Sequence, residues 1–286
     1  MIEIEGVSFS YRTGEQDAVR ALQDLDLRIE PGQFVAIIGH NGSGKSTLVK
    51  LLTAIQYPTE GEIRIDGVPV DEEDRWEIRR KVSVVFQDPD DQLVMNRVED
   101  DVAFGPENLG LPREEISERV ESSLEALGLR EIRGRLIEDL SSGQKQRVAI
   151  AGALAMRPRF LILDEPTSLL PVPVATRLVA TVRELNRREN MGVLHVTHSM
   201  YEAALFDRVV VMDSGRKFLD GPPKKVFRQV ERLREVGLDV PLPASLAHRL
   251  RARGIPLGGD VLNEEDLRTA ISGLGDAARR AGGSSG

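Results

Sequence analysis

One segment of eight residues constrains the fold of this chain more than any other. Residues 39–46 read Gly-His-Asn-Gly-Ser-Gly-Lys-Ser and match the pattern G-x-x-x-x-G-K-[ST]. A continuous apolar run, Phe34 to Ile38, precedes the segment, and an apolar helical pattern follows it through Leu52. An apolar run without alternation is typical of a strand that is covered on both faces. The segment therefore joins a buried strand to a helix.

The glycines and the lysine of this segment predict a phosphate-binding loop. Glycine lets the backbone curl until several N–H groups face one concavity, and the helix that follows adds its positive N-terminal end. Lys45 would reach the β and γ phosphates of a bound nucleotide, and Ser46 would offer its hydroxyl to Mg²⁺. The alternative is a plain glycine-rich turn, which the strand and the helix on either side disfavour. We expect the phosphates to be bound by Gly39, Asn41, Gly42, Ser43, Gly44, Lys45, Ser46 and Thr47.

A second apolar run, Phe160 to Leu163, ends in two acidic residues, Asp164 and Glu165. Ligands of open α/β sheets bind at the carboxyl ends of the strands, and this strand would deliver both carboxylates there. Asp164 would hold Mg²⁺, directly or through water, and Glu165 could orient and deprotonate an attacking water molecule. The alternative is a strand that simply ends in solvent at these acids.

Strand and helix patterns alternate along the chain, which favours an α/β fold with a largely parallel sheet and helices on its faces. A helical stretch at about 88–158 interrupts the alternation and is interpreted as an inserted subdomain. We divide the chain into a main domain at 1–220, a helical extension at 221–280 and a tail at 281–286. The Gly- and Ser-rich composition of the tail predicts mobility.

Composition excludes several classes of protein. The 286 residues contain no Cys, which rules out disulfides, thiolate zinc sites and a cysteine nucleophile. Lys plus Arg numbers 38 and Asp plus Glu 46, so the net charge is -8, which argues against a general nucleic-acid-binding protein. No uncharged apolar run approaches the ~18 residues that a membrane-spanning helix needs.

Several short motifs, taken together, resemble those of ATP-binding-cassette (ABC) ATPases. The sequence Leu-Ser-Ser-Gly-Gln at 140–144 resembles the LSGGQ signature of that family. Gln87 resembles the Q-loop glutamine, His198 the switch histidine, and Tyr11 the aromatic residue that stacks on adenine. Without the family, Tyr11 reads as a packed core aromatic and His198 as a histidine at a strand end. The motifs occur in the family's order over about residues 1–220.

The resemblance implies a P-loop NTPase fold with a mostly parallel sheet, an antiparallel β subdomain and an inserted helical subdomain. It also implies hydrolysis of ATP with Mg²⁺, in a head-to-tail pair of subunits where each signature closes on the partner's ATP. The family's functional residues can be carried over position by position. The resemblance implies that the catalytic residues are Lys45, Gln87, Glu165 and His198, and that further nucleotide contacts come from Tyr11, Ser141, Gly143 and Gln144. It implies that the metal is bound by Ser46, Gln87 and Asp164.

Longer stretches are similar to the ATPases of energy-coupling-factor (ECF) importers, which take up vitamins or transition-metal ions. These stretches are 39–42, 87–92, 103–108 and 144–152. The residues after 221 look like the C-terminal extension of that group, which helps the two ATPases to pair. The narrower resemblance implies a peripheral position on the cytoplasmic face of the cell membrane.

The same resemblance implies three protein partners and no nucleic acid. They are a second ABC ATPase, an integral membrane coupling subunit and, indirectly, a substrate-binding membrane subunit. The coupling subunit would contact the chain near Gln87, Asp90, Asp91 and Gln92, and its arginines could pair with Asp90 and Asp91. On the residues alone, an Asp-Pro turn that caps the next helix is the alternative.

Three positions depart from the ABC pattern. Ser142 stands where the signature usually has its first Gly, Pro171 where the D-loop usually has Asp, and Ser199 where Asp frequently follows the histidine. Ser142 adds side-chain atoms where backbone approaches phosphate, and Pro171 removes both an acceptor and a backbone donor. Because signature and D-loop serve the partner's ATP, we expect a heterodimer with unequal sites. The alternatives are that these changes are engineered or neutral, and that the pair is a homodimer. Two other functions stay open, a regulatory or structural nucleotide-binding subunit and a soluble ABC ATPase outside transport.

Overall fold

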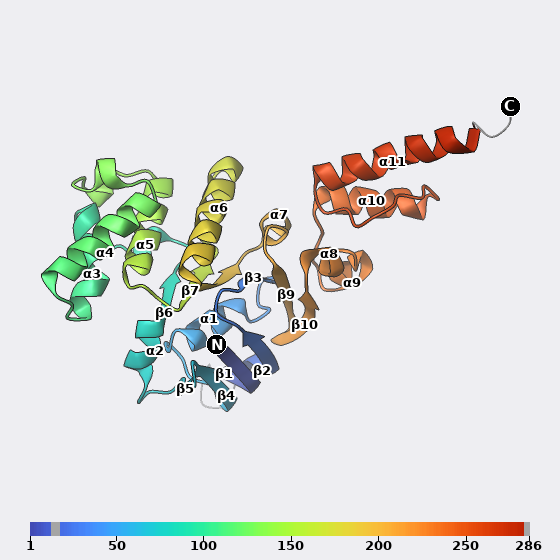
Figure 1. Ribbon diagram of the computed structural model, residues 1–286. Helices are drawn as coiled ribbons and strands as arrows, with labels where there is room; N and C mark the ends of the chain where they lie inside the picture. Colours follow the sequence, from blue (N-terminus) through green and yellow to red (C-terminus); the bar gives the residue numbers. More distant parts are fainter. Residues whose placement is uncertain (13–17, 283–286) are drawn as a thin grey trace.

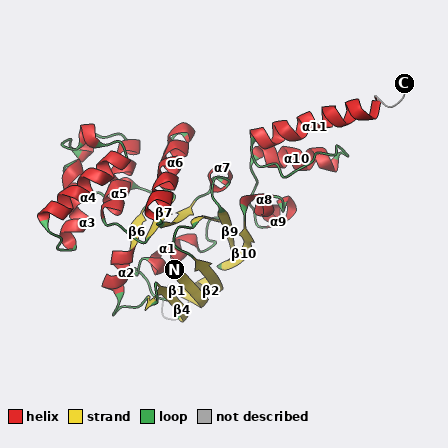
Figure 2. Ribbon diagram, in the orientation of Figure 1, coloured by secondary structure: helices red, strands yellow, loops and turns green. Residues whose placement is uncertain are grey.

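The structure is a computed structural model that describes residues 1–12 and 18–282. It contains two β-sheets, a group of helices to one side, and further helices that lead toward the C-terminus (Figure 1). The N-terminus lies in the smaller sheet, and the last helix extends away from the rest of the molecule (Figure 1). The larger sheet lies in the middle of the molecule with helices to either side, and the smaller sheet lies below it in this view (Figure 2).

The smaller sheet has four antiparallel strands that come from the N-terminal part of the chain. Ile2 pairs with Ile29 on one side and with Ile65 on the other, and all three side chains are buried. The strand order is β2 (Ala18–Ile29), β1 (Ile2–Arg12), β4 (Glu60–Ile65) and β5 (Val68–Pro69). This sheet is the antiparallel subdomain that the resemblance implied.

The larger sheet has six strands, and all neighbouring pairs are parallel except β9 with β10. Its order is β10 (Arg216–Gly221), β9 (Arg208–Asp213), β3 (Phe34–Ile38), β8 (Gly192–Val196), β7 (Phe160–Asp164) and β6 (Val82–Val85). All five residues of β3 are buried. Phe34, Ala36 and Ile38 belong to one hydrophobic core, and Val35 and Ile37 to the other. The apolar run of β3 therefore lacks alternation because both faces of the strand are covered.

Helices cover the two faces of the larger sheet. Helix α1 (Lys45–Leu52) follows the glycine-rich loop and packs, through Leu48 and Leu51, into the core that the two sheets share. Helix α6 (Val172–Glu189) packs on the opposite core through Leu178 and Val182. A short helix, α7 (Met200–Ala203), lies between β8 and β9.

The expected helical insertion at about 88–158 consists of several separate helices. It contains α3 (Val98–Asn108), α4 (Arg113–Ala126) and α5 (Ser142–Ala155). The 3₁₀ turn η1 (Pro89–Asp91) precedes α3, and the turns η2 (Arg130–Ile132) and η3 (Ile137–Asp139) lie between α4 and α5. Their apolar residues join the core that α6 also uses. Helix α2 (Arg75–Lys81) precedes β6 and lies on the same side of the molecule (Figure 1).

Four helices form the C-terminal part: α8 (Pro223–Phe227), α9 (Val230–Glu235), α10 (Leu242–Ala252) and α11 (Glu264–Gly282). Phe227 and Leu233 are buried in the same core as α6, so the first half of the predicted extension is continuous with the main domain. Helices α10 and α11 share a smaller core around Ala247. Helix α11 includes the first two residues of the predicted tail, and 283–286 lie outside the described residues. Within the described part, no helix is both long and apolar enough to cross a bilayer.

Candidate active site

The glycine-rich loop lies at the carboxyl end of β3, in the middle of the larger sheet. Gly42 and Gly44 have φ angles of 83° and 102°, a left-handed conformation that other residues seldom adopt. A Cβ on Gly44 would lie 2.7 Å from the Ala21 carbonyl oxygen, whereas one on Gly42 would meet no atom within 4 Å. The loop is therefore packed tightly against β2 on one side and open on the other, as a phosphate cradle must be.

The Lys45 ammonium lies inside the curl of this loop. It donates to the carbonyl oxygens of Gly39, at 2.8 Å, and His40, at 3.0 Å. The side chain is only 5% exposed, and burial lowers the pKa of Lys45, although the nearby charges of Glu165 and Asp164 act to raise it. The positive charge is thus held where incoming phosphates would meet it.

The order of the parallel strands brings the other predicted residues to the same edge. Strand β8 lies between β3 and β7, and β6 is the neighbour of β7. The carboxyl ends of these strands carry the loop, His198, the acids Asp164 and Glu165, and Gln87. A backbone hydrogen bond joins the ends of β7 and β8 at this edge: the Glu165 N–H donates to the Val196 carbonyl at 3.0 Å.

Glu165 and His198 form a close pair at this edge. The Glu165 Oε1 and His198 Nε2 atoms are 2.6 Å apart, with the carboxylate 18% and the imidazole 41% exposed. Glu165 has a φ of 53°, a left-handed conformation that costs a non-glycine residue about 1 kcal/mol or more. Such strain persists where the surrounding structure imposes it, which is frequently at a functional site.

The neighbouring carboxyl of Asp164 is held in an unfavourable environment. Burial and the negative charge of Glu165 raise the pKa of Asp164, although Lys45, Lys50 and His198 act against the rise. A bound divalent cation would relieve both effects, because it supplies the missing positive charge.

Asp164 and Ser46 fit the requirements of a magnesium site. Ser46 is exposed at the first turn of α1, directly after the loop. Mg²⁺ is usually held by one or two protein oxygens together with substrate phosphates, rather than by a cage of protein ligands. The described residues contain no cluster of three or more His, Cys, Asp or Glu that could hold a metal by themselves. Gln87, the third predicted ligand, is exposed at the end of β6.

Tyr11 lies beside the start of α1. Its hydroxyl is 3.3 Å from the Thr47 Oγ1 atom, and the Lys50 Nζ atom is 5.6 Å from the centre of its ring. The ring is half-buried and contacts Phe9 edge-on. Tyr11 is therefore next to the phosphate loop, where stacking on a base remains a prediction.

The signature residues begin helix α5 and are not joined to the chain's own phosphate loop. Ser141 is the N-cap, and its side chain and that of Gln144 each accept a hydrogen bond from the other's backbone N–H, which forms a capping box. The structure records no hydrogen bond or ion pair between 141–144 and 39–47 among the described residues. Ser142 is exposed in the first turn of α5. Of the first amides of α5, those of Ser142 and Gly143 have no hydrogen-bond partner among the described residues, whereas the Gln144 N–H is bonded to Ser141.

The acidic turn after Gln87 is partly engaged within the chain. The Asp88 carboxylate caps η1 by accepting from the Asp90 N–H at 2.9 Å, which is the capping role considered above. The Asp90 carboxylate pairs with Lys145 of α5 at 2.6 Å. The Gln92 side chain accepts from the Phe86 N–H, just after β6, at 3.0 Å and donates to the Val84 carbonyl of β6 at 3.1 Å.

Two of the three departures from the ABC pattern lie next to this edge. Ser199 caps α7 by accepting from the Glu202 N–H at 3.2 Å, and Ser and Asp are about equally good N-caps, so this replacement preserves the local structure. Pro171 is the N-cap of α6, with φ -59° and ψ 143°, and offers neither an N–H nor a side-chain acceptor.

Sequence reasoning missed a polar cluster directly behind Glu165 and His198. Glu202 accepts hydrogen bonds from His195, Thr167 and Thr197, and the donor side chains are buried. A histidine inside the otherwise apolar strand Val193–Val196 was the one sequence signal for it.

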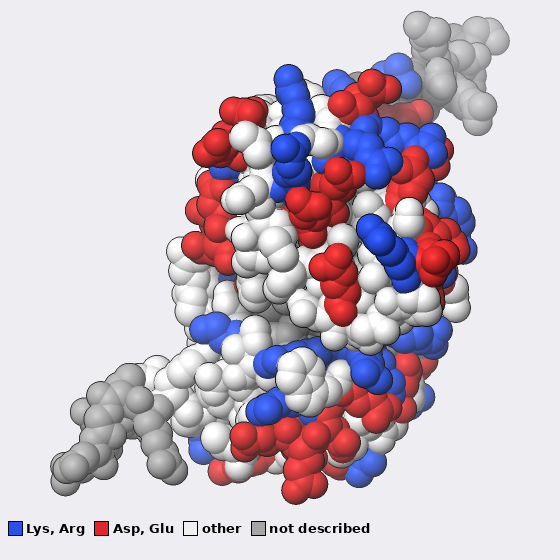
Figure 3. Space-filling view, turned by 90° about the vertical axis from the view of Figure 1, so that its left-hand side faces the viewer, with Lys and Arg blue, Asp and Glu red and all other residues white. Residues whose placement is uncertain are grey.

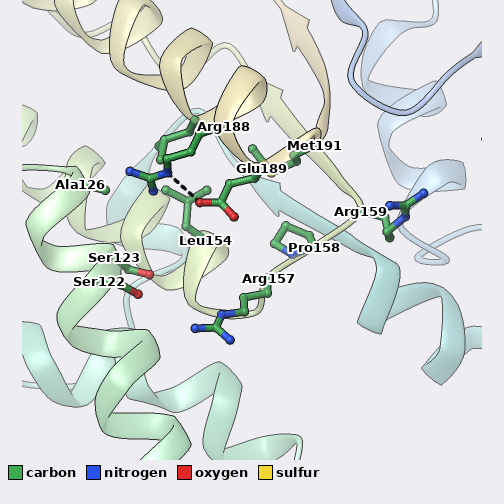
Figure 4. Close-up of a pocket in the computed structure, with 11 residues that line it drawn as sticks. Ser122, Ser123, Ala126, Leu154, Arg157, Pro158, Arg159, Arg188, Glu189 and Met191 are labelled. Atoms are coloured by element: carbon green, nitrogen blue, oxygen red, sulfur yellow. Dashed lines mark hydrogen bonds and ion pairs between the residues drawn. The ribbon is translucent and has the colours of Figure 1, made fainter.

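One cavity lies near this edge of the sheet, and another lies far from it. One of about 630 Å³ adjoins Glu165 and His198. The other, of about 300 Å³, lies among Arg157, Arg159 and Met191, just before β7 and β8 begin (Figure 4). It is thus at the amino ends of these strands, opposite the edge where ligands of such sheets bind.

Comparisons with known proteins agree with this geometry. A family model described as ABC transporter matches residues 22–168. The chain is 48% identical over 269 residues to the energy-coupling factor transporter ATP-binding protein EcfA1 of Caldanaerobacter subterraneus subsp. tengcongensis, covering 93% of this chain and 97% of that relative.

Solved structures of ABC ATPases are also similar to this chain. CbiO1 from Clostridium perfringens, part of the ABC transporter complex CbiONQ, is 36% identical with a TM-score of 0.74, covering 86% of this chain and 98% of that one. A post-hydrolysis dimer of the ATP-binding cassette MJ0796 with ADP and Pi is 30% identical with a TM-score of 0.71, covering 78% of this chain and 99% of that one.

The raised pKa of Asp164 leads to a prediction about stability. Because the folded protein holds the Asp164 proton more tightly than the unfolded chain, the free energy of unfolding falls as pH rises from the pKa of the unfolded chain to the raised pKa. Asp164→Asn should therefore raise the melting temperature of the nucleotide-free protein at pH 7, by about 2–4 °C. The gain should shrink as pH falls and vanish below the pKa of the unfolded chain.

Thermal melts of the variant and of the unchanged protein across this pH range are the measurement. Asp91→Asn, at an exposed carboxylate, is the matched control and should change the melting temperature little. A gain for Asp164→Asn that stayed constant down to low pH would contradict the assignment.

Proposed function

The chain belongs to the ABC transporter family, as an ATP-binding subunit of an energy-coupling-factor transporter, and on this premise we propose that it powers the uptake of a vitamin or a transition-metal ion. The family, the fold class and the ATP hydrolase activity predicted from the sequence are confirmed, with ATP and Mg²⁺ as substrate and metal. The chain acts with membrane subunits and a second ATPase. The class of solute, the position on the cytoplasmic face and the roles of single residues are our proposal.

The contact between Glu165 and His198, at 2.6 Å, is the observation that best supports hydrolysis at the chain's own site. A subunit that only held a nucleotide would need the phosphate loop and Lys45, but no carboxylate aimed and paired at the same edge. The pair therefore favours a hydrolytic subunit over a purely regulatory or structural one.

The proposed reaction assigns one task to each residue at this edge. The loop amides and Lys45 bind the β and γ phosphates and stabilise the charge that spreads over the transferred group. Glu165 orients a water molecule and accepts its proton as the water oxygen bonds to the γ phosphorus and the bond to the β–γ bridging oxygen breaks. His198, whose Nε2 atom lies 2.6 Å from Glu165 Oε1, would keep the carboxylate aimed. Mg²⁺, held by Ser46, Gln87 and Asp164, would neutralise phosphate charge.

A second ATPase completes the site in this proposal. The first amides of α5 and its helix dipole are suited to hold the γ-phosphate of an ATP that sits on the partner's loop. Two ATP molecules then join the subunits head to tail. Hydrolysis replaces a bridging contact with repulsion, and the pair opens.

We propose that the membrane-embedded coupling subunit contacts the chain at Gln87 and Asp91. Both are exposed, whereas Asp90 and Gln92 already have partners in their own chain. Val94, a short distance along the chain, is 61% exposed and adds apolar surface. The side of the molecule with α2 to α4 carries interleaved basic and acidic side chains with uncharged surface between them, which suits a protein partner (Figure 3).

Two variants of the assembled complex should affect different steps, one the binding of nucleotide and the other its hydrolysis. Lys45→Ala should weaken Mg-ATP binding about 10- to 100-fold, because charge-assisted bonds to the phosphates are lost. Glu165→Gln should retain binding and lower kcat about 100-fold or more, because the general base is lost. Binding is measured by calorimetry and turnover by phosphate release. Lys225→Ala, at an exposed lysine, is the control; a Glu165→Gln complex with full turnover would refute the proposed base.

The contact with the coupling subunit is tested by charge reversal. Asp91→Arg should sharply reduce the amount of integral membrane subunit that co-purifies with the chain, because an attractive charge becomes repulsive. Mg-ATP binding should not change. Glu184→Arg, on the exposed side of α6, is the matched reversal and should co-purify normally. Equal recovery with both variants would place the contact elsewhere.

The unequal-site hypothesis predicts a gain of function. Ser142→Gly combined with Pro171→Asp should raise the ATPase rate of the assembled complex, because it restores backbone approach and an acceptor at the site that the partner's loop completes. Asp is also a better N-cap than Pro, so Pro112→Asp, at the N-cap of α4 with φ -59° and ψ 145°, is the control for helix capping. No gain in turnover would count against unequal sites.

A further inference from the structure

One buried carboxylate oxygen behind the active site accepts three hydrogen bonds. Glu202 Oε2 lies 2.9 Å from His195 Nε2, 2.8 Å from Thr167 Oγ1 and 3.0 Å from Thr197 Oγ1. The Glu202 side chain is 12% exposed and that of His195 is 1% exposed. The three donors come from two different parts of the chain, the turn after β7 and the end of β8.

The donors keep Glu202 ionised. Burial acts to raise the pKa of Glu202, but the hydrogen bonds and charge of His195 and the hydroxyls of Thr167 and Thr197 outweigh it, so the pKa lies below its ordinary value. Hydrogen bonds to a charged acceptor are roughly twice as strong as neutral ones. The carboxylate is therefore held in place by strong hydrogen bonds and is not an isolated buried charge.

His195 is oriented for this one contact. Its ring stacks on Phe206, with centroids 5.0 Å apart, and its Nδ1 atom is buried without a hydrogen-bond partner among the described residues. Since the carboxylate can only accept, the proton is assigned to Nε2, which faces Glu202. A polar side chain at a fully buried strand position costs stability unless it is hydrogen-bonded, and the contact with Glu202 is the hydrogen bond that His195 makes.

Glu202 thereby joins the two segments that carry the catalytic pair. Thr167 lies two residues after Glu165, and Thr197 directly precedes His198. The Thr197 hydroxyl oxygen also accepts from the Ser199 N–H at 3.0 Å, which fixes the turn that carries His198. The segment of the base and the segment of the histidine are thus tied to one atom.

We propose that Glu202 is a positioning residue that sets the distance between Glu165 and His198. It acts through Thr167 and Thr197 and does not contact the reacting atoms. The inference rests on the proposed roles of Glu165 and His198, and it extends them to a second layer of side chains that hold both segments in register for hydrolysis.

The sharpest test removes one hydroxyl. Thr167→Val keeps the shape of the side chain and loses its bond to Glu202, whereas Thr167→Ser keeps the hydroxyl. A misplacement of about 1 Å can cost up to 100-fold in rate. We expect Thr167→Val and Glu202→Gln to lower kcat about tenfold, with the Kd for Mg-ATP within twofold because the phosphate loop is untouched, and Thr167→Ser to stay within twofold of the unchanged protein in kcat.

The double variant gives a second readout. If Thr167 acts through Glu202, Thr167→Val together with Glu202→Ala should be no slower than Glu202→Ala alone, because both changes break the same link. Thr181→Val and Glu184→Gln on α6 are the matched controls and should leave kcat unchanged. Fully multiplicative effects of the two changes would contradict a shared link.

All rates are measured in the assembled complex, after subtraction of the rate that remains with Glu165→Gln, so that only turnover at this chain's site is compared. The inference is overturned by a Thr167→Val kcat equal to that of the unchanged protein. It is also overturned by equal losses in the Val and Ser variants, or by a nucleotide affinity that falls in step with kcat. An unchanged complex with no Glu165-dependent turnover would instead refute the proposed function itself, and this inference with it.

Discussion

Burial of β3 on both faces is the constraint on which the rest of the structure depends. Because Phe34 and Ile38 pack into one core and Val35 and Ile37 into the other, a one-residue shift of register would move each side chain into the opposite core and disrupt the packing of both. The phosphate loop at its end is thereby held against β2, and its lysine stays inside the curl. Parallel pairing with β8 on one side then places every other catalytic group relative to this loop.

Local signals and the family resemblance together predicted the centre of the site. The loop at 39–46 and the acids at the end of β7 were predicted from the apolar runs before them, whereas the role of His198 came from the resemblance to ABC ATPases. The order of the strands brings all of them to one edge. Strands β4 and β5 gave weaker signals, because they are short and, on β4, only Ile63 and Ile65 are buried. The union of α8 and α9 with the main core could not be predicted from spacing, since it depends on contacts with distant helices.

Long-range polar contacts were the part that sequence reasoning missed. The pairing of Asp90 with Lys145 joins the acidic turn to the signature helix, and nothing in either segment alone predicts the partner. The Glu202 cluster is of the same kind, because its members are ordinary residues until the fold brings them together. Only His195, a polar residue in an apolar strand, signalled that a buried partner was needed.

The chain carries two sets of groups, one for its own nucleotide and one for the nucleotide of a partner, and they differ in how well they match the ABC pattern. The groups that serve its own nucleotide are in place, with Lys45 in the loop and Glu165 paired to His198. The groups offered to a partner contain the departures Ser142 and Pro171, while Ser199 preserves its local cap. This division of groups supports our proposal that the chain hydrolyses ATP at its own loop with help from a second subunit.

The most direct test of this account is the structure of the assembled Glu165→Gln complex with Mg-ATP. The account predicts the triphosphate inside the curl of 39–46, with Lys45 moved from the carbonyls of Gly39 and His40 onto the phosphates and His198 facing the γ-phosphate. A nucleotide bound away from this edge, or a lysine that still contacts only its own loop, would contradict it.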